Sequence, residues 1–259
     1  MGSITDSDPA WELNVQRGFV PGHRVTLFVG VAEGVSAVER DVWPQQSYRV
    51  WPTSAATLSV VSNSADDAAA GTGARTVVVI GMDASYLEKS EVVALNGLTP
   101  VSTVGTFLRV QTVTTVTVGS TGSNVGTITI THSGNAQQIM TPTTNLARCM
   151  ALTIPENHTG FIMDALLTFT TTQLGETRGI ALQSHLRSQT GIVTKATRTF
   201  YEVSHQSRFG FIGALKQRTD LWFSTRMHST GGSETASVSG LLTLAIIHND
   251  YVNPSVSGA

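Results

Sequence analysis

Hydrophobic and polar residues alternate with a period of two along much of this chain. Residues 112–118 read Thr-Val-Thr-Thr-Val-Thr-Val, and residues 127–131 read Thr-Ile-Thr-Ile-Thr. Successive side chains of a β-strand point to opposite faces, so this alternation is typical of strands with one buried and one solvated face. The pattern predicts a first series of strands at 58–61, 76–80, 91–95, 107–118 and 127–131.

Glycine-rich breaks separate these strands at intervals of about ten residues. They lie at 71–73, 96–97, 119–122 and 124–126. Glycine and asparagine supply the positive φ angles that tight hairpin turns require. Short strands with regular turns favour a sandwich or barrel over alternating strands and helices.

A second series of apolar segments follows a Thr/Asn/Pro-rich stretch at 140–145. Its members lie at 150–154, 161–172, 179–187, 192–203, 221–228 and 237–248. The segment 161–169 competes as a helix, but three threonines follow it and no capping box precedes it, which favours a strand. We therefore predict an all-β protein with two β-sandwich or jelly-roll-like domains at 51–145 and 146–259, and with less than about a fifth of the residues in helices.

Residues 1–50 are predicted to form an extended N-terminal arm followed by an aromatic connector. Prolines and glycines in residues 1–24 deny the arm regular structure, yet Trp11, Leu13, Val15 and Phe19 are too apolar for a free tail. Another subunit is expected to cover these side chains, for example by strand addition. Packing of the arm on its own first domain remains an alternative.

Charged residues make up only 13% of the chain, about half the usual share, and the formal net charge is -2. This charge does not support an electrostatic grip on nucleic acid, and no sequence-specific nucleic-acid partner is expected. The start of the chain lacks the features of an export or lipidation signal, and no apolar run is long enough for a membrane helix. Synthesis in the cytoplasm of a host cell and no membrane partner are therefore expected.

No motif for catalysis, metal binding or a cofactor can be found in the sequence. Cys149 is the single cysteine, and the seven histidines show no metal-ligand spacing. Asp66 and Asp67 precede the glycines of 71–73, but the segment lacks the lysine of a phosphate loop and the ligand series of a calcium loop. A polar hairpin loop is the preferred interpretation, and an ion site there stays open. We expect no enzyme activity, no cofactor and no metal.

The basic side chains are unusual, because 13 are arginine and only three are lysine. Protein interfaces are enriched in arginine and aromatic residues and depleted in lysine. Eight basic residues against three acids between 176 and 228 indicate either a solvated strand face with ion pairs or a patch that docks an acidic protein surface. The candidate interface residues are Trp11, Leu13, Val15, Phe19, Trp43, Tyr48, Trp51, Arg178, Arg187, Arg198, Arg208 and Arg218.

Several turn-and-strand segments resemble a β-rich family encoded among the structural genes of tailed bacteriophages. The similar segments are 62–67, 71–77, 81–83, 91–97, 123–128, 151–155 with Gly160, and 218–221. The resemblance spans about residues 40–250, and Met82 and Leu87 depart from the more polar turn of the family. It implies a virion structural protein, and no catalytic residue carries over from it.

Together, the pattern and the resemblance predict a non-enzymatic virion protein. A head decoration or cement protein that stabilises the capsid is the first expectation, as a homotrimer that contacts the major capsid protein or other virion proteins. The alternatives are a tail-associated or head-fibre protein, or a carbohydrate-binding module that uses Trp43, Tyr48 and Trp51. An esterase or lyase with a hidden serine or carboxylate site also remains open.

Overall fold

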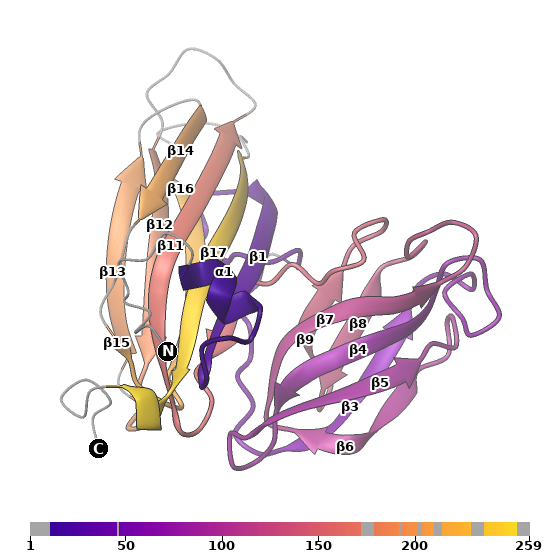
Figure 1. The fold of residues 1–259 in the computed structure, drawn as a ribbon. Coiled ribbons are helices and arrows are strands. Elements are labelled where there is room, and N and C mark those ends of the chain that lie inside the picture. The colour runs from indigo at the N-terminus through magenta and orange to yellow at the C-terminus, as the bar shows by residue number, and fades with distance from the viewer. Residues whose placement is uncertain are drawn as a thin grey trace.

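A computed structural model of the chain describes residues 11–45, 47–171, 179–191, 193–200, 204–209, 214–228 and 236–252. Within these ranges the regular structure is almost entirely β (Figure 1), with one short α-helix, α1 (Trp11–Gln16), and one 3-10 turn, η1 (Asn249–Tyr251). The predicted all-β class is confirmed.

Two sheets carry the strands of the second series together with the first strands of the chain. The first sheet has the order β1 (His23–Val35), β17 (Ala236–His248), β11 (His158–Thr171) and β14 (Ser204–Phe209), with β15 (Ala214–Leu215) on β11. The second has the order β10 (Ala151–Thr153), β16 (Asp220–His228), β12 (Gly179–Arg187) and β13 (Val193–Phe200), with β2 (Arg40–Asp41) on β16. We call these two sheets the C-terminal unit.

Two further sheets hold the strands of the first series, and we call them the N-terminal unit. One has the order β6 (Val101–Phe107), β3 (Ala56–Ser62), β8 (Ile128–His132) and β9 (Asn135–Met140). The other has the order β5 (Glu88–Ala94), β4 (Ala74–Met82) and β7 (Arg109–Val118). Every pairing in the four sheets is antiparallel among the described strands.

Each unit has its own hydrophobic core, to which both of its sheets contribute. In the N-terminal unit, Ile130 of β8 belongs to the same buried cluster as Val79 of β4. In the C-terminal unit, Leu167 of β11 shares a cluster with Phe223 of β16. Strand β8 shows why the alternation predicted its structure, because its residues are alternately buried and half-buried from Ile128 onwards.

The structure has four separate sheets, whereas the sequence predicts two jelly-roll-like domains, each formed by one continuous stretch of the chain. The strands β1 and β2 belong to the C-terminal unit, although the sequence placed residues 1–50 in an arm and connector. β1 pairs along β17 from His23 to Val35, and β2 pairs with β16. The apolar run at 25–31 indicates a short strand, and only the distant partner at 236–248 reveals the sheet to which it belongs.

The prediction of an extended arm is wrong for residues 11–16, which form the helix α1. No proline or glycine interrupts this stretch, and Val15 is buried at 3% exposure on the same chain. Gly18 adopts a φ of 74° after the helix, and the amides of Gly18 and Phe19 donate to the carbonyls of Val15 and Asn14. This is a Schellman closure, which satisfies the last helical carbonyls.

Asp67 organises the loops that join the sheets of the N-terminal unit, and its side chain is fully buried. Its Oδ1 accepts the amides of Ala74 and Val125 at 2.8 and 2.9 Å. Its Oδ2 accepts the Ser62 hydroxyl at 2.6 Å and the Gly126 amide at 2.8 Å. The carboxylate therefore connects β3, β4 and the loop before β8, and both of its oxygens are saturated.

Asp67→Asn is expected to destabilise the protein by about 2–4 kcal/mol, because it removes a charged acceptor and places an amide NH2 against N–H donors. Urea unfolding measures the change. The matched control is Asp66→Asn at the exposed neighbouring position, where a change within about 0.5 kcal/mol is expected. Equal effects of the two substitutions would contradict this role of Asp67.

Candidate functional site

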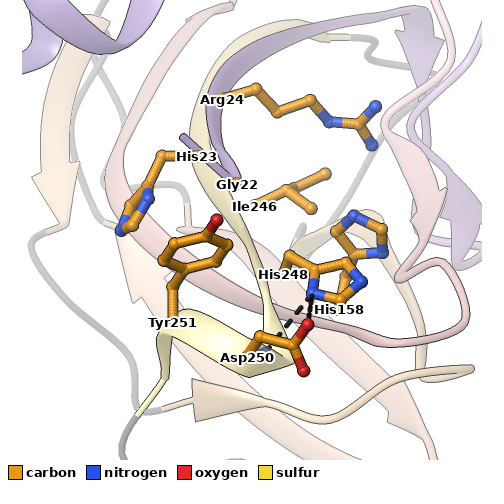
Figure 2. A pocket seen from close by; sticks show the side chains of 8 residues that line it. All are labelled: Gly22, His23, Arg24, His158, Ile246, His248, Asp250 and Tyr251. Atoms are coloured by element: carbon orange, nitrogen blue, oxygen red, sulfur yellow. Dashed lines mark hydrogen bonds and ion pairs between the residues drawn. The ribbon is translucent and has the colours of Figure 1, made fainter. Parts of the chain in front are cut away.

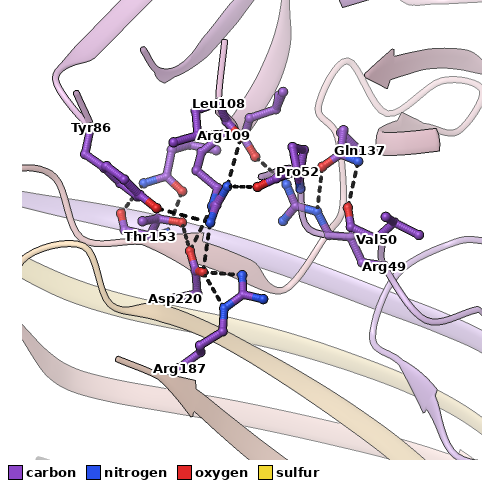
Figure 3. A network of polar contacts seen from close by, with 12 residues as sticks. Arg49, Val50, Pro52, Tyr86, Leu108, Arg109, Gln137, Thr153, Arg187 and Asp220 are labelled. Carbon is purple, nitrogen blue, oxygen red and sulfur yellow. Dashed lines mark hydrogen bonds and ion pairs between the residues drawn. The ribbon is translucent and has the colours of Figure 1, made fainter. Parts of the chain in front are cut away.

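The largest concentration of buried charge in the described part of the chain lies between the two units, around Asp220 at the start of β16. The carboxylate accepts two bonds from Arg109 of β7, from Nε to Oδ1 at 3.0 Å and from Nη2 to Oδ2 at 3.1 Å. Arg109 is 5% exposed and Asp220 is 2% exposed. This bidentate pair, shown in Figure 3, joins the N-terminal unit to the C-terminal unit across a region without solvent.

Two more side chains complete the shell of Asp220. Arg187 of β12 donates to Oδ2 through Nε at 2.9 Å and also through Nη2. The Thr153 hydroxyl donates to Oδ1 at 2.5 Å. One carboxylate thus faces two guanidinium groups, so removal of the carboxylate would leave two cations close together in a buried place.

Trp51 of the connector lies among three cations of this network. The guanidinium carbons of Arg49, Arg109 and Arg187 are 4.6, 5.3 and 4.9 Å from the centre of its ring. The ring also contacts Trp222 of β16, with the two ring centres 5.4 Å apart. Desolvated cation–π contacts of this kind are stabilising, so the indole supports the positive side chains around Asp220.

A pair of amide-type hydrogen bonds crosses the same boundary. The Gln111 side chain of β7 donates Nε2 to the Thr153 carbonyl at 2.5 Å and accepts the Thr153 amide at 2.9 Å. Arg49, at 6% exposure, donates Nη2 to the Val110 carbonyl at 2.9 Å and Nε to the Gln137 Oε1 at 3.3 Å. We call these contacts together with the Asp220 cluster the joint.

Surface contacts surround the joint. Arg218 donates to Glu156 and lies 5.5 Å above the ring of Tyr86, which belongs to the turn between β4 and β5. The Glu156 amide also donates to the Tyr86 carbonyl at 2.9 Å. Tyr86 has a φ of 62°, a conformation that costs energy for a bulky residue and persists only where its surroundings hold it.

The contacts of the joint connect the N-terminal unit to the C-terminal unit. The Asp220 carboxylate is bonded to Arg109, Arg187 and Thr153, and Arg109 also donates Nη1 to the Pro52 carbonyl at 2.6 Å. A reacting group would need access to a substrate, whereas Asp220 and Arg109 are almost completely covered. The joint therefore holds two β units in one orientation.

A serine, a histidine and an acid do meet elsewhere, in the C-terminal unit. The Ser224 hydroxyl donates to Glu39 Oε1 at 2.8 Å, and His185 Nε2 lies 2.7 Å from the same hydroxyl oxygen. In a catalytic triad the acid accepts a hydrogen bond from the histidine nitrogen that faces away from the serine. Here the Glu39 carboxylate accepts the hydrogen bond of the serine hydroxyl instead. Ser224 has no exposed surface, and His185 stacks on Trp222 with ring centres 4.8 Å apart. This cluster links Glu39, the residue before β2, to Ser224 of β16 and His185 of β12, and the Ser224 hydroxyl is not accessible.

A hollow of about 420 Å³ lies where β1, β11 and β17 approach η1 (Figure 2). His158 and His248 contact edge to face, with ring centres 5.2 Å apart. The Nδ1 atoms of His23 and His158 lie 2.8 and 2.7 Å from the carbonyls of Pro21 and Glu156. The rings of His23 and His158 therefore each carry a proton on Nδ1, because a carbonyl oxygen can only accept a hydrogen bond. Within the described ranges, no group of three histidine, cysteine or acidic side chains is arranged to hold a metal ion.

A second hollow, of about 310 Å³, lies beside the connector and is lined by residues 50–54 and by residues of the turn between β8 and β9. The connector aromatics do not share one exposed face there. Trp43 is buried at 1% exposure with Ile139 and Cys149, Tyr48 is 55% exposed, and Trp51 lies half-buried among its cations. A flat sugar-binding platform made of these three rings, as the sequence allowed, is not formed.

The predicted interface residues have different fates in the structure. Leu13 and Phe19 are exposed, at 54% and 59%, whereas Trp11 is half-buried against His23 and Val15 is covered by its own chain. Arg187 and Arg218 are engaged in ion pairs. Arg178 lies outside the described residues, as do the side chains of Arg198 and Arg208. Only two of the five candidate arginines, Arg187 and Arg218, have described side chains, so the basic patch stays a prediction.

Sequence reasoning selected Trp51 and Arg187 of the joint as candidate interface residues, but it missed Asp220, Arg109 and Gln111. Arg109 and Gln111 alternate at the start of a strand whose other inward positions are apolar, and Asp220 begins β16. Charged and amide side chains on the buried face of a strand are the available signal, since such groups need partners inside the protein. Their partners lie 42 to 111 residues away and could not be read from spacing.

No helix in the described residues is long and apolar enough to cross a membrane. Cys149 is buried, and burial raises the pKa of its thiol to about 11, so the thiolate form is disfavoured.

No family model matches the chain, and no curated protein matches it in sequence. Among solved structures, it is similar to the VP2 subviral particle of infectious bursal disease virus, with 10% identity and a TM-score of 0.28 over 96% of this chain and 80% of that chain. T=1 particles derived from infectious bursal virus give 12% identity and a TM-score of 0.26, over 91% and 72% of the two chains. TM-scores of this size do not establish a common fold, and the functional argument rests on the chain itself.

Asp220→Ala is expected to cost about 3–5 kcal/mol of stability, because it leaves the buried Arg109 and the half-buried Arg187 without their counter-charge. Denaturant unfolding should also separate into two transitions as the units lose their coupling. Asp250→Ala is the control, since the Asp250 side chain is 81% exposed. A loss below about 1 kcal/mol with a single transition would show that Asp220 does not hold the units together.

Proposed function

We propose that the protein is a non-enzymatic structural protein of a virion. The observation that carries this proposal is the use of its buried polar chemistry: Asp220, Arg109 and Asp67 hold sheets and units together and face no substrate. The cluster of Ser224, His185 and Glu39 has the contacts of a structural cross-link. A low-charge, arginine-rich β protein with a rigid joint suits an assembly that must keep its shape.

We further propose that each pair of sheets acts as a β-sandwich domain, with the division near residue 145 except for β1 and β2. The two separate cores support this division. The joint then sets the angle between the domains, so that the surfaces of both can meet a neighbouring subunit or shell in a fixed relation.

The more specific proposal is a head decoration or cement protein of a tailed phage, which binds the major capsid protein as a homotrimer. Its support is the resemblance of segments such as 62–67, 91–97 and 123–128 to a family of tailed-phage structural proteins. A tail-associated or head-fibre protein shares the same chemistry and differs in copy number and position.

Mass spectrometry of purified virions of the phage that encodes the chain tests this proposal. A decoration protein should be present in a copy number comparable to that of the major capsid protein, and particles without it should lose their DNA at lower temperature. A few copies per particle would favour the tail or fibre alternative. Complete absence from purified particles would refute a virion role.

The exposed side of α1 is the proposed contact between subunits. Leu13 and Phe19 are both more than half exposed, although α1 itself is held on its own chain through Val15. The double variant Leu13→Ser with Phe19→Ser should therefore keep its unfolding transition and lose trimers, as measured by light scattering. Leu98→Ser with Val104→Ser, at exposed apolar positions of the N-terminal unit, is the matched control and should leave the trimer unchanged. Trimers that persist in the α1 variant would rule out this contact.

A further inference from the structure

The hollow beside the connector is lined by one deeply buried polar side chain, that of His132 at the end of β8. His132 is 5% exposed, and its Nε2 lies 3.1 Å from the Phe107 carbonyl oxygen. Because a carbonyl oxygen only accepts, Nε2 carries the proton in the neutral ring, and Nδ1 is left as an acceptor. Nδ1 has no hydrogen-bond partner among the described residues. A buried acceptor that borders a hollow and lacks a partner indicates a partner from outside the chain.

Other polar groups of the hollow are unpaired as well. The hydroxyls of Thr53, Ser54 and Ser133 make no hydrogen bond within the described part of the chain. Asn135 donates its Nδ2 to the Ser133 carbonyl at 3.3 Å, and its Oδ1 accepts nothing from the described residues. A hydroxyl both donates and accepts, so the hollow offers groups that can exchange hydrogen bonds with other hydroxyls, beside acceptors that can take their protons.

No charged side chain lines the hollow in the part of the chain that the structure describes. The guanidinium groups of Arg49 and Arg109 lie against the Trp51 ring and donate to the joint instead. A phosphate, sulfate or carboxylate would therefore enter without a counter-charge and would lose its hydration. Residues 50–52 add an apolar wall of valine, indole and proline. An apolar wall with a few polar groups is the usual lining of a small-molecule site.

The segments that line the hollow are held by the joint and by a tight turn. The Val50 carbonyl accepts Gln137 Nε2 at 3.0 Å, and the Pro52 carbonyl accepts Arg109 Nη1 at 2.6 Å. Between β8 and β9, Ser133 and Gly134 have φ angles of 49° and 82°, which are the two positive values of a type I′ hairpin turn. A ligand that binds between fixed segments loses little free energy to ordering of the protein.

We propose that this hollow binds a single neutral sugar residue, such as the terminal hexose of a glycan. Its volume of about 310 Å³ is near the lower end of the range of small-molecule sites, about 300–1,000 Å³, and so suits one ring. The sugar hydroxyls donate to His132 and Asn135 and bond with the hydroxyls of the connector and the turn, while its C–H groups lie against residues 50–52. Trp43 and Tyr48 take no part, so the site differs from a platform of three rings. Sugar binding does not depend on whether the protein belongs to a virion.

Amide NMR of the ¹⁵N-labelled full chain tests the proposal. The probes are the methyl glycosides of glucose, galactose, mannose and N-acetylglucosamine, with glucose 6-phosphate as the charged comparison. At least one glycoside should shift the amide signals of residues 53–54 and 133–135 along a saturable curve, with a Kd of about 1 mM. Glucose 6-phosphate should bind at least about fivefold more weakly than methyl glucoside, because its phosphate finds no counter-charge. The absence of a saturable shift with all four glycosides would overturn the proposal, as would equal or tighter binding of glucose 6-phosphate.

A pair of double variants locates the site. Thr53→Val with Ser54→Ala removes two exposed hydroxyls from the hollow and should weaken binding of the same glycoside about tenfold, with the urea unfolding transition unchanged. Thr99→Val with Ser102→Ala removes two exposed hydroxyls of the same unit outside the hollow, and its affinity should stay within about twofold of the wild type. Equal affinities of the two double variants would show that the sugar does not bind in this hollow.

Discussion

The buried Asp220 carboxylate is the central contact between the two β units. Asp220 accepts two hydrogen bonds from Arg109 of the N-terminal unit. It also forms an ion pair with Arg187 of the C-terminal unit, to which Asp220 itself belongs. Burial of these charges costs desolvation energy, which is offset only when geometry and hydrogen bonding are nearly complete. Thr153 and Trp51 supply the missing partners, and this completeness makes one relative orientation of the units much better than its neighbours. In this protein the charge cluster is best understood as a device for orientation more than for stability.

The rest of the structure meets the general requirements of β-sheets, which are a buried face, tight turns and protected edges. Both cores are built mainly from aliphatic residues, which alternate with threonines in β8, and turns of the N-terminal unit depend on asparagine, glycine and the saturated carboxylate of Asp67. The lateral edges are also managed by side chains, because Glu91 of β5 accepts the amides of Val104 and Gly105 at 2.7 and 2.9 Å. Capping an edge in this way removes donors that would otherwise pair with another chain.

Hydrogen bonding of buried polar groups to one another also accounts for the arrangement of Ser224, His185 and Glu39. Ser224, His185 and Glu39 have the composition of a triad, yet their connectivity is that of a cross-link between β2 and its sheet. Some buried polar atoms of the described residues have no hydrogen-bond partner, among them Asp41 Oδ1, Arg49 Nη1 and Gln138 Oε1.

The sequence by itself determined the class of this protein and most of its strands, because a period of two with glycine turns is a local property of adjacent residues. The alternation at 127–131 appears directly in the burial of β8, and the ambiguous segment at 161–169 is indeed a strand. It could not show that β1 pairs with β17 more than 200 residues later, or that Trp43 is buried while Tyr48 is exposed. It also assigned residues 11–16 to an extended arm, since the closure at Gly18 and the packing of Val15 depend on a surface that exists only after folding. Only the tertiary structure brought Arg109 to Asp220 and Asp41 to Arg49. The energy of a buried charge depends on groups that are close in space but distant in the sequence, whereas the alternation that indicates a strand depends on adjacent residues.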